Sequence, residues 1–129
     1  MARSLKKRAD MPEMPNDDLC ERTFRFSSDV YDYAVDLERL GGLPRRLAYQ
    51  LFDAAGSVGA NREEARAAYS RKDFAAKNSI SLRESREAKF WLRLADAKKL
   101  GHADCRTRLL KEADELVAIF TKIVKRLQT

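Results

Sequence analysis

Residues 51–74 read LFDAAGSVGANREEARAAYSRKDF, and the small residues in this segment indicate how the fold is built. The small residues are Ala54, Ala55, Gly56, Ser57, Gly59 and Ala60. A glycine inside a helix costs about 1 kcal/mol relative to alanine. Close approach of a second helix over small side chains can offset this cost. The segment therefore predicts a helix that packs tightly against a neighbour.

Apolar residues recur at helical spacing on both sides of this segment and predict four helices. The first is expected from a cap at Ser27 or Ser28 to the glycines at 41 and 42. The second begins at Pro44, and a break near residues 70–72 precedes a third that runs to about Lys99. The fourth begins at residue 103 or 104 and continues through Leu127. Short connections make neighbours antiparallel, so we expect an all-α, up-down-up-down four-helix bundle over residues 17–129.

Composition limits the class of protein further. Charged residues make up 36% of the chain, which favours long solvated helices, and no apolar stretch approaches the roughly 20 residues that span a bilayer. Cys20 and Cys105 are far apart and belong to no CxxC pair, as is usual in a reducing compartment. We therefore expect a cytoplasmic protein whose residues 1–16 form a flexible basic tail.

Charge is segregated along the chain. Residues 16–43 hold three Lys and Arg against seven Asp and Glu, whereas residues 44–100 hold thirteen against seven. A basic excess of this kind suits phosphate contacts, and it also suits contact with the acidic face of a neighbouring subunit or a solvated helix surface. The candidate nucleic-acid-binding residues are Arg45, Arg46, Arg62, Arg66, Arg71, Lys72, Arg83, Arg86, Lys89 and Arg93.

The residues needed for catalysis are missing from the sequence. His102 is the only histidine and lies in an expected turn, which argues against Ser-His-Asp and Cys-His chemistry and against a bundle di-iron site. No glycine-rich loop follows a strand to hold a nucleotide. We expect a protein that is not an enzyme and that has no metal and no cofactor.

Polar residues of the second and third helices should lie at similar heights if the chain folds back near Arg71. They predict a buried polar network that sets helix register or subunit pairing, in which each member needs a partner. Its expected members are Ser57, Asn61, Glu64, Glu84 and Glu87, with Asn78, Ser81 and Arg83 at the same level.

The same residues resemble a known family. The second helix carries the pattern Gln50, Leu51, Ala54, Ala55, Ser57, Val58, Asn61 and Glu64. The restart at residues 71–74, the segment SISLRESRE at 79–87, the Trp91-Leu92 pair and the Leu100-Gly101 turn follow in step. Over Phe26 to Leu127 the chain resembles the four-helix bundle proteins encoded in intervening sequences of bacterial 23S ribosomal RNA genes.

Two segments depart from the family pattern. Arg62-Glu63-Glu64-Ala65 stands where the family usually has Ile-Ala-Glu-Gly, so we expect the second helix to continue past Asn61. Lys77 and Asn78 stand where the family more often carries large apolar residues, which alters the expected packing there.

The resemblance implies a homo-oligomer, most often a pentameric ring with a central channel, and it implies no catalysis. The accessory variability proteins of diversity-generating retroelements share the fold and bind a reverse transcriptase and nucleic acid through a basic surface. By similarity, we expect binding to the backbone of RNA or DNA through the second and third helices. The alternative is a protein–protein assembly or adaptor module that binds no nucleic acid.

Overall fold

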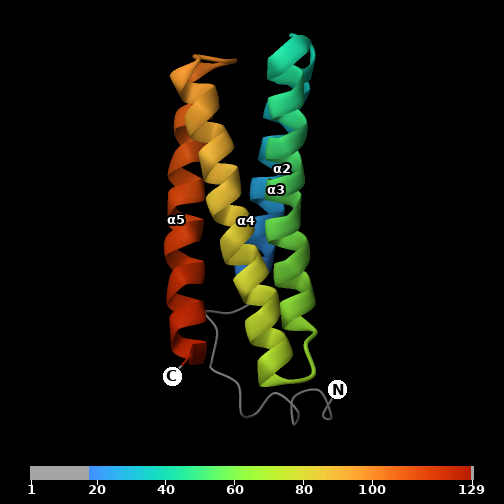
Figure 1. The fold of residues 1–129 in the computed structure, drawn as a ribbon, viewed down its shortest axis with the longest axis vertical. Helices are drawn as coiled ribbons and strands as arrows, with labels where there is room; N and C mark the ends of the chain where they lie inside the picture. The colour runs from blue at the N-terminus through green and yellow to red at the C-terminus, as the bar shows by residue number, and fades with distance from the viewer. Residues whose placement is uncertain (1–17, 129) are drawn as a thin grey trace.

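The computed structural model describes residues 18–128, which form an antiparallel bundle of four helices (Figure 1). The helices are α2 (Asp18–Glu38), α3 (Gly42–Arg66), α4 (Arg71–Ala97) and α5 (Ala103–Gln128). The α2–α3 and α4–α5 turns lie at one end and the α3–α4 turn at the other. The predicted all-α bundle is confirmed, and the predicted tail at residues 1–16 lies outside the described residues.

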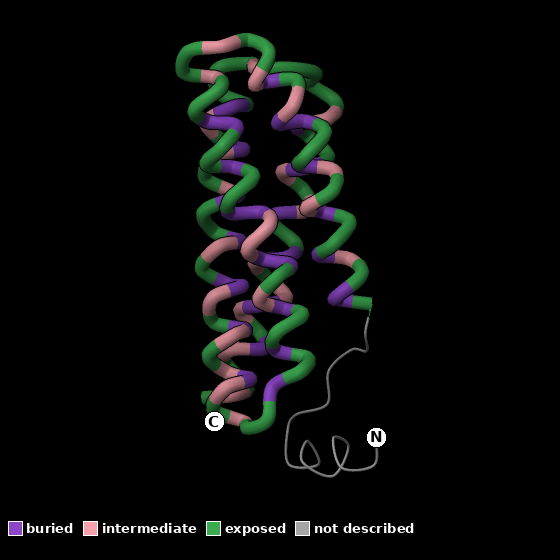
Figure 2. The backbone as a smooth tube through the Cα atoms, turned by 90° about the vertical axis from the view of Figure 1, so that its right-hand side faces the viewer, coloured by how far each residue is buried: buried purple, intermediate pink, exposed green. Residues whose placement is uncertain are grey.

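The core is a stripe of buried residues on each helix. Buried positions face the interior and exposed positions face outward along the length of the bundle (Figure 2). In α5 the stripe consists of Leu109, Ala113, Leu116, Phe120 and Ile123, which follow a spacing of three or four residues as expected. No helix among residues 18–128 combines the length and apolar character required to cross a membrane.

The small residues of α3 allow α2 to approach closely, as predicted. A Cβ atom added at Gly59 would lie 3.3 Å from the Ser27 hydroxyl oxygen and 3.3 Å from the Thr23 carbonyl oxygen of α2. Ser27 donates a hydrogen bond of 2.8 Å across the interface to the carbonyl of Ala55. At Gly56 an added Cβ would meet no atom within 4 Å, so the close contact depends on one glycine of the pair.

The first helix begins earlier than predicted, at Asp18 rather than after Ser27. Ser27 is not a cap, because its hydroxyl donates to the carbonyls of Thr23 and Ala55 from within the helix. Leu19 and Phe26 are buried and extend the apolar stripe by more than two turns. Packing against the other helices therefore outweighs the capping preference of serine, which on its own favoured a later start.

Local sequence signals determine the two turns that follow α3 and α4. Ser70 caps α4, since its hydroxyl oxygen accepts a 3.0 Å hydrogen bond from the Asp73 backbone N–H, and the break is where it was predicted.

In the α4–α5 turn, Gly101 adopts a positive φ of 68°, which favours glycine. The Tyr33 hydroxyl donates to the Leu100 carbonyl at 2.7 Å, and burial raises the pKa of Tyr33 to about 12. The phenol therefore remains protonated and holds this turn against α2.

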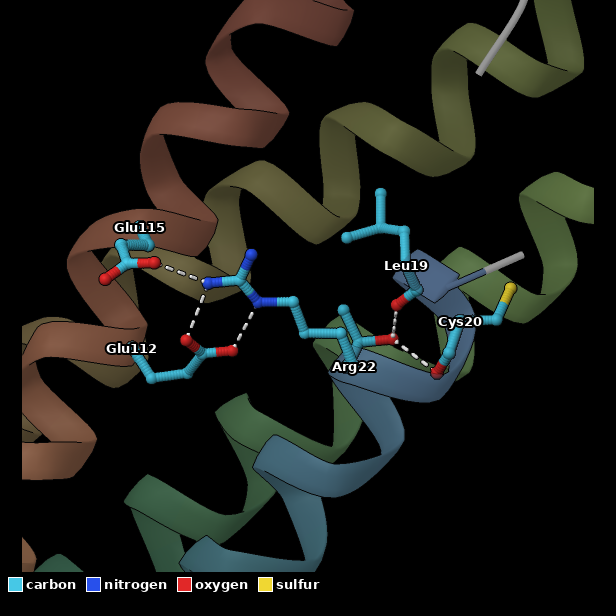
Figure 3. Close-up of polar contacts among 6 residues, drawn as sticks. Leu19, Cys20, Arg22, Glu112 and Glu115 are labelled. Carbon is cyan, nitrogen blue, oxygen red and sulfur yellow. Dashed lines mark hydrogen bonds and ion pairs between the residues drawn. The ribbon is translucent and has the colours of Figure 1, made fainter. Parts of the chain in front are cut away.

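Of the helix pairs that touch, α2 and α5 have the smallest contact, and Arg22 of α2 bridges the two helices by ion pairs (Figure 3). Its Nε and Nη2 atoms each lie 2.7 Å from the Glu112 carboxylate, and Nη2 also lies 2.7 Å from Glu115. These bonds, those to Glu112 foremost, raise the pKa of Arg22. The planar guanidinium matches the two oxygens of Glu112, so this bidentate pair closes the bundle.

Candidate nucleic-acid interface

A row of exposed residues runs along the outer side of α4. Its members recur at alternating spacings of four and three, which places them on one face of the helix. They are Lys72, Ala76, Ser79, Arg83, Arg86, Phe90, Arg93 and Ala97. The four cations Lys72, Arg83, Arg86 and Arg93 form what we call the α4 cationic row. At 1.5 Å of rise per residue, it extends over about 32 Å.

The cations of this row are accessible to a ligand. The Arg83 side chain is 73% exposed and lies 3.8 Å from Glu84, which is a weak ion pair in water. Arg86 and Arg93 are exposed and form no ion pair with any residue between 18 and 128. Lys89 differs, because its ammonium lies 2.6 Å from Asp114 of α5. The positive charges of the row are therefore largely unneutralised by other side chains among residues 18–128.

The other predicted basic residues are spread along the length of the bundle. Arg46 lies near the start of α3 and faces the end of α4, while Arg66 and Arg71 lie at the opposite end beside the α3–α4 turn. Arg45 lies on the side of α3 that faces α2: its Nε donates to the Tyr49 hydroxyl of α3 at 3.2 Å, and Tyr49 donates to Glu38 of α2 at 2.6 Å. The candidates form an elongated surface rather than one compact patch.

Arg62 does not belong to this surface, so its assignment as a nucleic-acid-binding candidate is wrong. Its residue exposure is 2%. The guanidinium donates a 3.0 Å hydrogen bond to Asn78 Oδ1 of α4 and lies 5.7 Å from the centre of the Phe74 ring. Asn78 in turn donates to the Phe74 carbonyl at 2.9 Å. Arg62 is a structural cation of the α3–α4 interface.

The two departures from the family pattern meet at this contact. Arg62 and Asn78 each stand where a large apolar residue was expected, and the structure pairs them with one another. A buried polar group requires a hydrogen-bond partner, and each of these two residues supplies one to the other, which allows both to be buried. Sequence reasoning noted both positions separately and missed their pairing.

The predicted polar network is wrong for Asn61 and Glu64, whereas Asn78 and Ser81, which were expected at the same level, are buried and bond to α3. Asn61 donates to the carbonyl and hydroxyl oxygens of Ser57 in its own helix, at 2.9 and 3.1 Å, and Glu64 is exposed. The buried polar contacts between α3 and α4 come from Asn78 with Arg62, which was not an expected member, and from the Ser81 hydroxyl, which donates to the Val58 carbonyl at 2.9 Å.

Glu84 and Glu87 form a separate carboxyl pair on the side of α4. Burial raises the pKa of the Glu84 carboxyl, and the hydrogen bond and negative charge of Glu87 raise it further, whereas Arg83 lowers it. Within residues 18–128, no cluster of three or more His, Cys, Asp or Glu side chains is arranged to hold a metal ion. The pair is therefore a local electrostatic feature beside the cationic row.

Phe90 was not among the predicted site residues, although it lies within the exposed row between Arg86 and Arg93. Its exposure is 53%, and its ring meets the Trp91 ring edge-on at 5.1 Å. The spacing of four and three from Arg83 to Arg93 could have identified it, because that spacing defines a shared helix face.

The structure thus defines an all-α bundle protein with a basic outer row on α4. Residues 16–122 match the family described as 23S rRNA-intervening sequence protein, and the chain belongs to this family. A crystal structure of a protein of unknown function from the S23 ribosomal protein family of Bacteroides thetaiotaomicron has the same fold. Its TM-score is 0.72 at 24% identity, with 83% of this chain and 98% of that chain covered. No curated protein matches the chain.

Proposed function

We propose that this protein is a homo-oligomeric bundle that binds the backbone of RNA or DNA through the α4 cationic row. The observation that carries this proposal is the exposure of Arg83, Arg86 and Arg93 on one face, with Lys72 in line with them. Arginine matches phosphate geometry through its planar fork, and exposed cations release counterions from nucleic acid on binding. The proposed role is binding and assembly rather than catalysis, in the cytoplasm.

Membership of the family supports self-association, and a pentameric ring is the assembly that we propose. Kinship with the accessory proteins of diversity-generating retroelements, also proposed here, would add a reverse transcriptase as a candidate partner. The net charge of +6 gives the long-range attraction that nucleic-acid binding requires.

Fluorescence anisotropy with labelled RNA and DNA duplexes over a salt series tests the proposal. Wild-type affinity should fall linearly with salt on a log–log plot. The variant Arg86→Gln with Arg93→Gln should bind more weakly at every sequence, and its salt slope should be smaller by about 2, since each phosphate contact contributes about 0.9.

The matched control removes the same charge elsewhere. Lys111 and Lys122 are exposed on α5, and the double change Lys111→Gln with Lys122→Gln should retain the wild-type slope. If both double variants lose affinity equally, net charge rather than the α4 row governs binding. Absence of wild-type binding at low salt would refute the proposal.

The second candidate function is an adaptor that binds only proteins. The exposed aromatic residues Tyr31, Tyr49 and Phe52 favour it, because aromatic residues are enriched at protein interfaces. A protein partner that co-purifies with wild type, together with no nucleic-acid binding at low salt, would favour the adaptor.

A further inference from the structure

Two apolar surfaces flank α3 on its opposite sides. The first, which we call the α3–α4 groove, has a volume of about 630 Å³. Its apolar lining consists of Leu43, Pro44, Leu47, Trp91, Leu94 and Leu100. The second, which we call the aromatic surface, lies between α2 and α3 and consists of Tyr31, Tyr49 and Phe52 around Ala34, Val35 and Ala48.

The groove has the features of a binding surface that a partner covers. Leu43 is 78% exposed at its edge, where water contact with a large aliphatic side chain is unfavourable. The Trp91 indole Nε1 atom is buried and has no hydrogen-bond partner among the described residues. The lining of the groove therefore fits an apolar occupant.

The aromatic surface has the complementary chemistry. Tyr31 and Tyr49 are 55% and 49% exposed, and Tyr31 meets Phe52 edge-on with ring centres 5.6 Å apart. These rings supply apolar area together with phenol oxygens that can accept hydrogen bonds. Rigid aromatic side chains of this kind dominate the energetics of many protein interfaces.

The groove is flanked by cations, whereas the aromatic surface adjoins the acidic helix α2 and holds its own nearby cation, Arg45, on Tyr49. Arg46 and Lys98 line the groove. Glu38 lines the aromatic surface and accepts a 2.6 Å hydrogen bond from Tyr49, which also accepts from Arg45. The helix that carries Glu38, α2, holds six Asp and Glu against two Arg. Like charges would oppose groove-to-groove or aromatic-to-aromatic pairing, whereas opposite charges favour contact between the two surfaces.

We propose that the aromatic surface of one copy docks into the α3–α4 groove of the next copy, head to tail. This inference rests on the homo-oligomer proposed above and names its contact surfaces. The two surfaces lie on opposite sides of α3, which packs against both α2 and α4, so one subunit cannot cover its own groove. Each docking event leaves one surface of each kind free at the ends, and a head-to-tail contact closes into a ring when the rotation between successive copies returns to the start, and otherwise extends as an open filament.

Two charge-introducing variants at exposed positions test the contact. Tyr31→Lys places a cation opposite Arg46 and Lys98 of the neighbour, and Leu43→Glu places an anion opposite Glu38. Each variant alone should dissociate to monomers in native mass spectrometry, with affinity weaker by about tenfold or more because like charges meet across the interface. Phe24→Lys is the matched control, since Phe24 is 64% exposed on α2 and lies outside both surfaces, and it should assemble as wild type does.

Mixing the two defective variants in equal amounts gives the decisive result. The Leu43→Glu chain retains an intact aromatic surface and the Tyr31→Lys chain an intact groove, so the mixture should form mixed dimers or larger species. A contact between identical surfaces predicts no such recovery. Assembly of both single variants like wild type would overturn the assigned surfaces while leaving the proposed homo-oligomer intact.

Trp91 provides a second readout because it is the only tryptophan in the chain. Its emission should shift to longer wavelength when wild type is diluted and the groove empties. In Tyr31→Lys the longer wavelength should already be present at high concentration, although the substitution lies on the other side of α3. A monomeric wild type at micromolar concentration would overturn both the homo-oligomer and this inference, and would assign the groove to a different partner.

Discussion

Alanine at Gly59 should destabilise the protein, whereas alanine at Gly56 should stabilise it. Both positions lie inside α3, where replacing glycine with alanine gains about 1 kcal/mol of helix stability. At Gly56 the new methyl group meets no atom within 4 Å, so the full gain should be realised.

At Gly59 the same gain is opposed by a steric cost. The methyl group would lie 3.3 Å from both the Ser27 hydroxyl oxygen and the Thr23 carbonyl oxygen, which is tighter than ordinary contact. The Thr23 carbonyl oxygen is a backbone atom of α2 and cannot rotate away, so α2 must shift by a few tenths of an ångström. Overpacking of this kind costs about 1–3 kcal/mol, and weakening the Ser27–Ala55 hydrogen bond adds about 1 kcal/mol. After the helix gain is subtracted, the net loss should be about 1–3 kcal/mol.

Thermal and urea unfolding followed by circular dichroism at 222 nm measures both effects. The two variants should differ in stability by about 2–4 kcal/mol, and since 1 kcal/mol corresponds to about 4 °C in Tm for a chain of this size, their Tm values should differ by roughly 8–16 °C. Protein concentration must be equal in all samples, because self-association would shift Tm by mass action. If Gly59→Ala is as stable as Gly56→Ala, the close approach of α2 and α3 does not depend on that glycine, and the packing argument is refuted.

Three further predictions concern the polar contacts. In a double-mutant cycle of Arg22→Met and Glu112→Gln, urea unfolding should give a coupling energy of about 1 kcal/mol, and a value near zero would show that the bidentate pair does not hold α2 to α5. Asn78→Leu should cost about 2–3 kcal/mol by removing an acceptor of buried Arg62, whereas adding Arg62→Met should recover much of this loss. Additive losses in the double variant would argue against the pairing. Glu84 has a raised pKa in the fold, so its stabilising contribution is complete at acid pH and is lost as pH rises through the folded pKa. Glu84→Gln should therefore exceed wild type in stability at neutral pH, with a gap that narrows below the ordinary glutamate pKa and that a pH series of unfolding curves can measure.

Much of the fold could be read from local patterns. The stripe of α5, the break near residue 70 and the end of α4 before Gly101 all depend on interactions between residues close in sequence, and the structure confirms them. The start of α2 was missed because Leu19 and Phe26 are held in the helix by packing against distant residues. A capping preference of about 1 kcal/mol at Ser27 cannot compete with the burial of two large apolar side chains.

The candidate site was predicted only in part for a similar reason. Helical spacing was sufficient to place Arg83, Arg86 and Arg93 on the third helix, and their shared exposed face follows from that spacing. It could not show that Arg62 points into the bundle, because an arginine at an interior position is expected only where a partner such as Asn78 is available. That partner lies sixteen residues away on another helix.

The sequence by itself determined that the chain forms four helices, where their apolar stripes lie and that the second and third carry the basic excess. These properties depend on periodicity and composition, which are local quantities. Only the tertiary structure decided that Gly59 and not Gly56 meets α2, that Arg22 closes the bundle onto Glu112, and that two apolar surfaces flank α3. Such contacts depend on the rotation and separation of neighbouring helices, which the packing of all four side-chain stripes sets together.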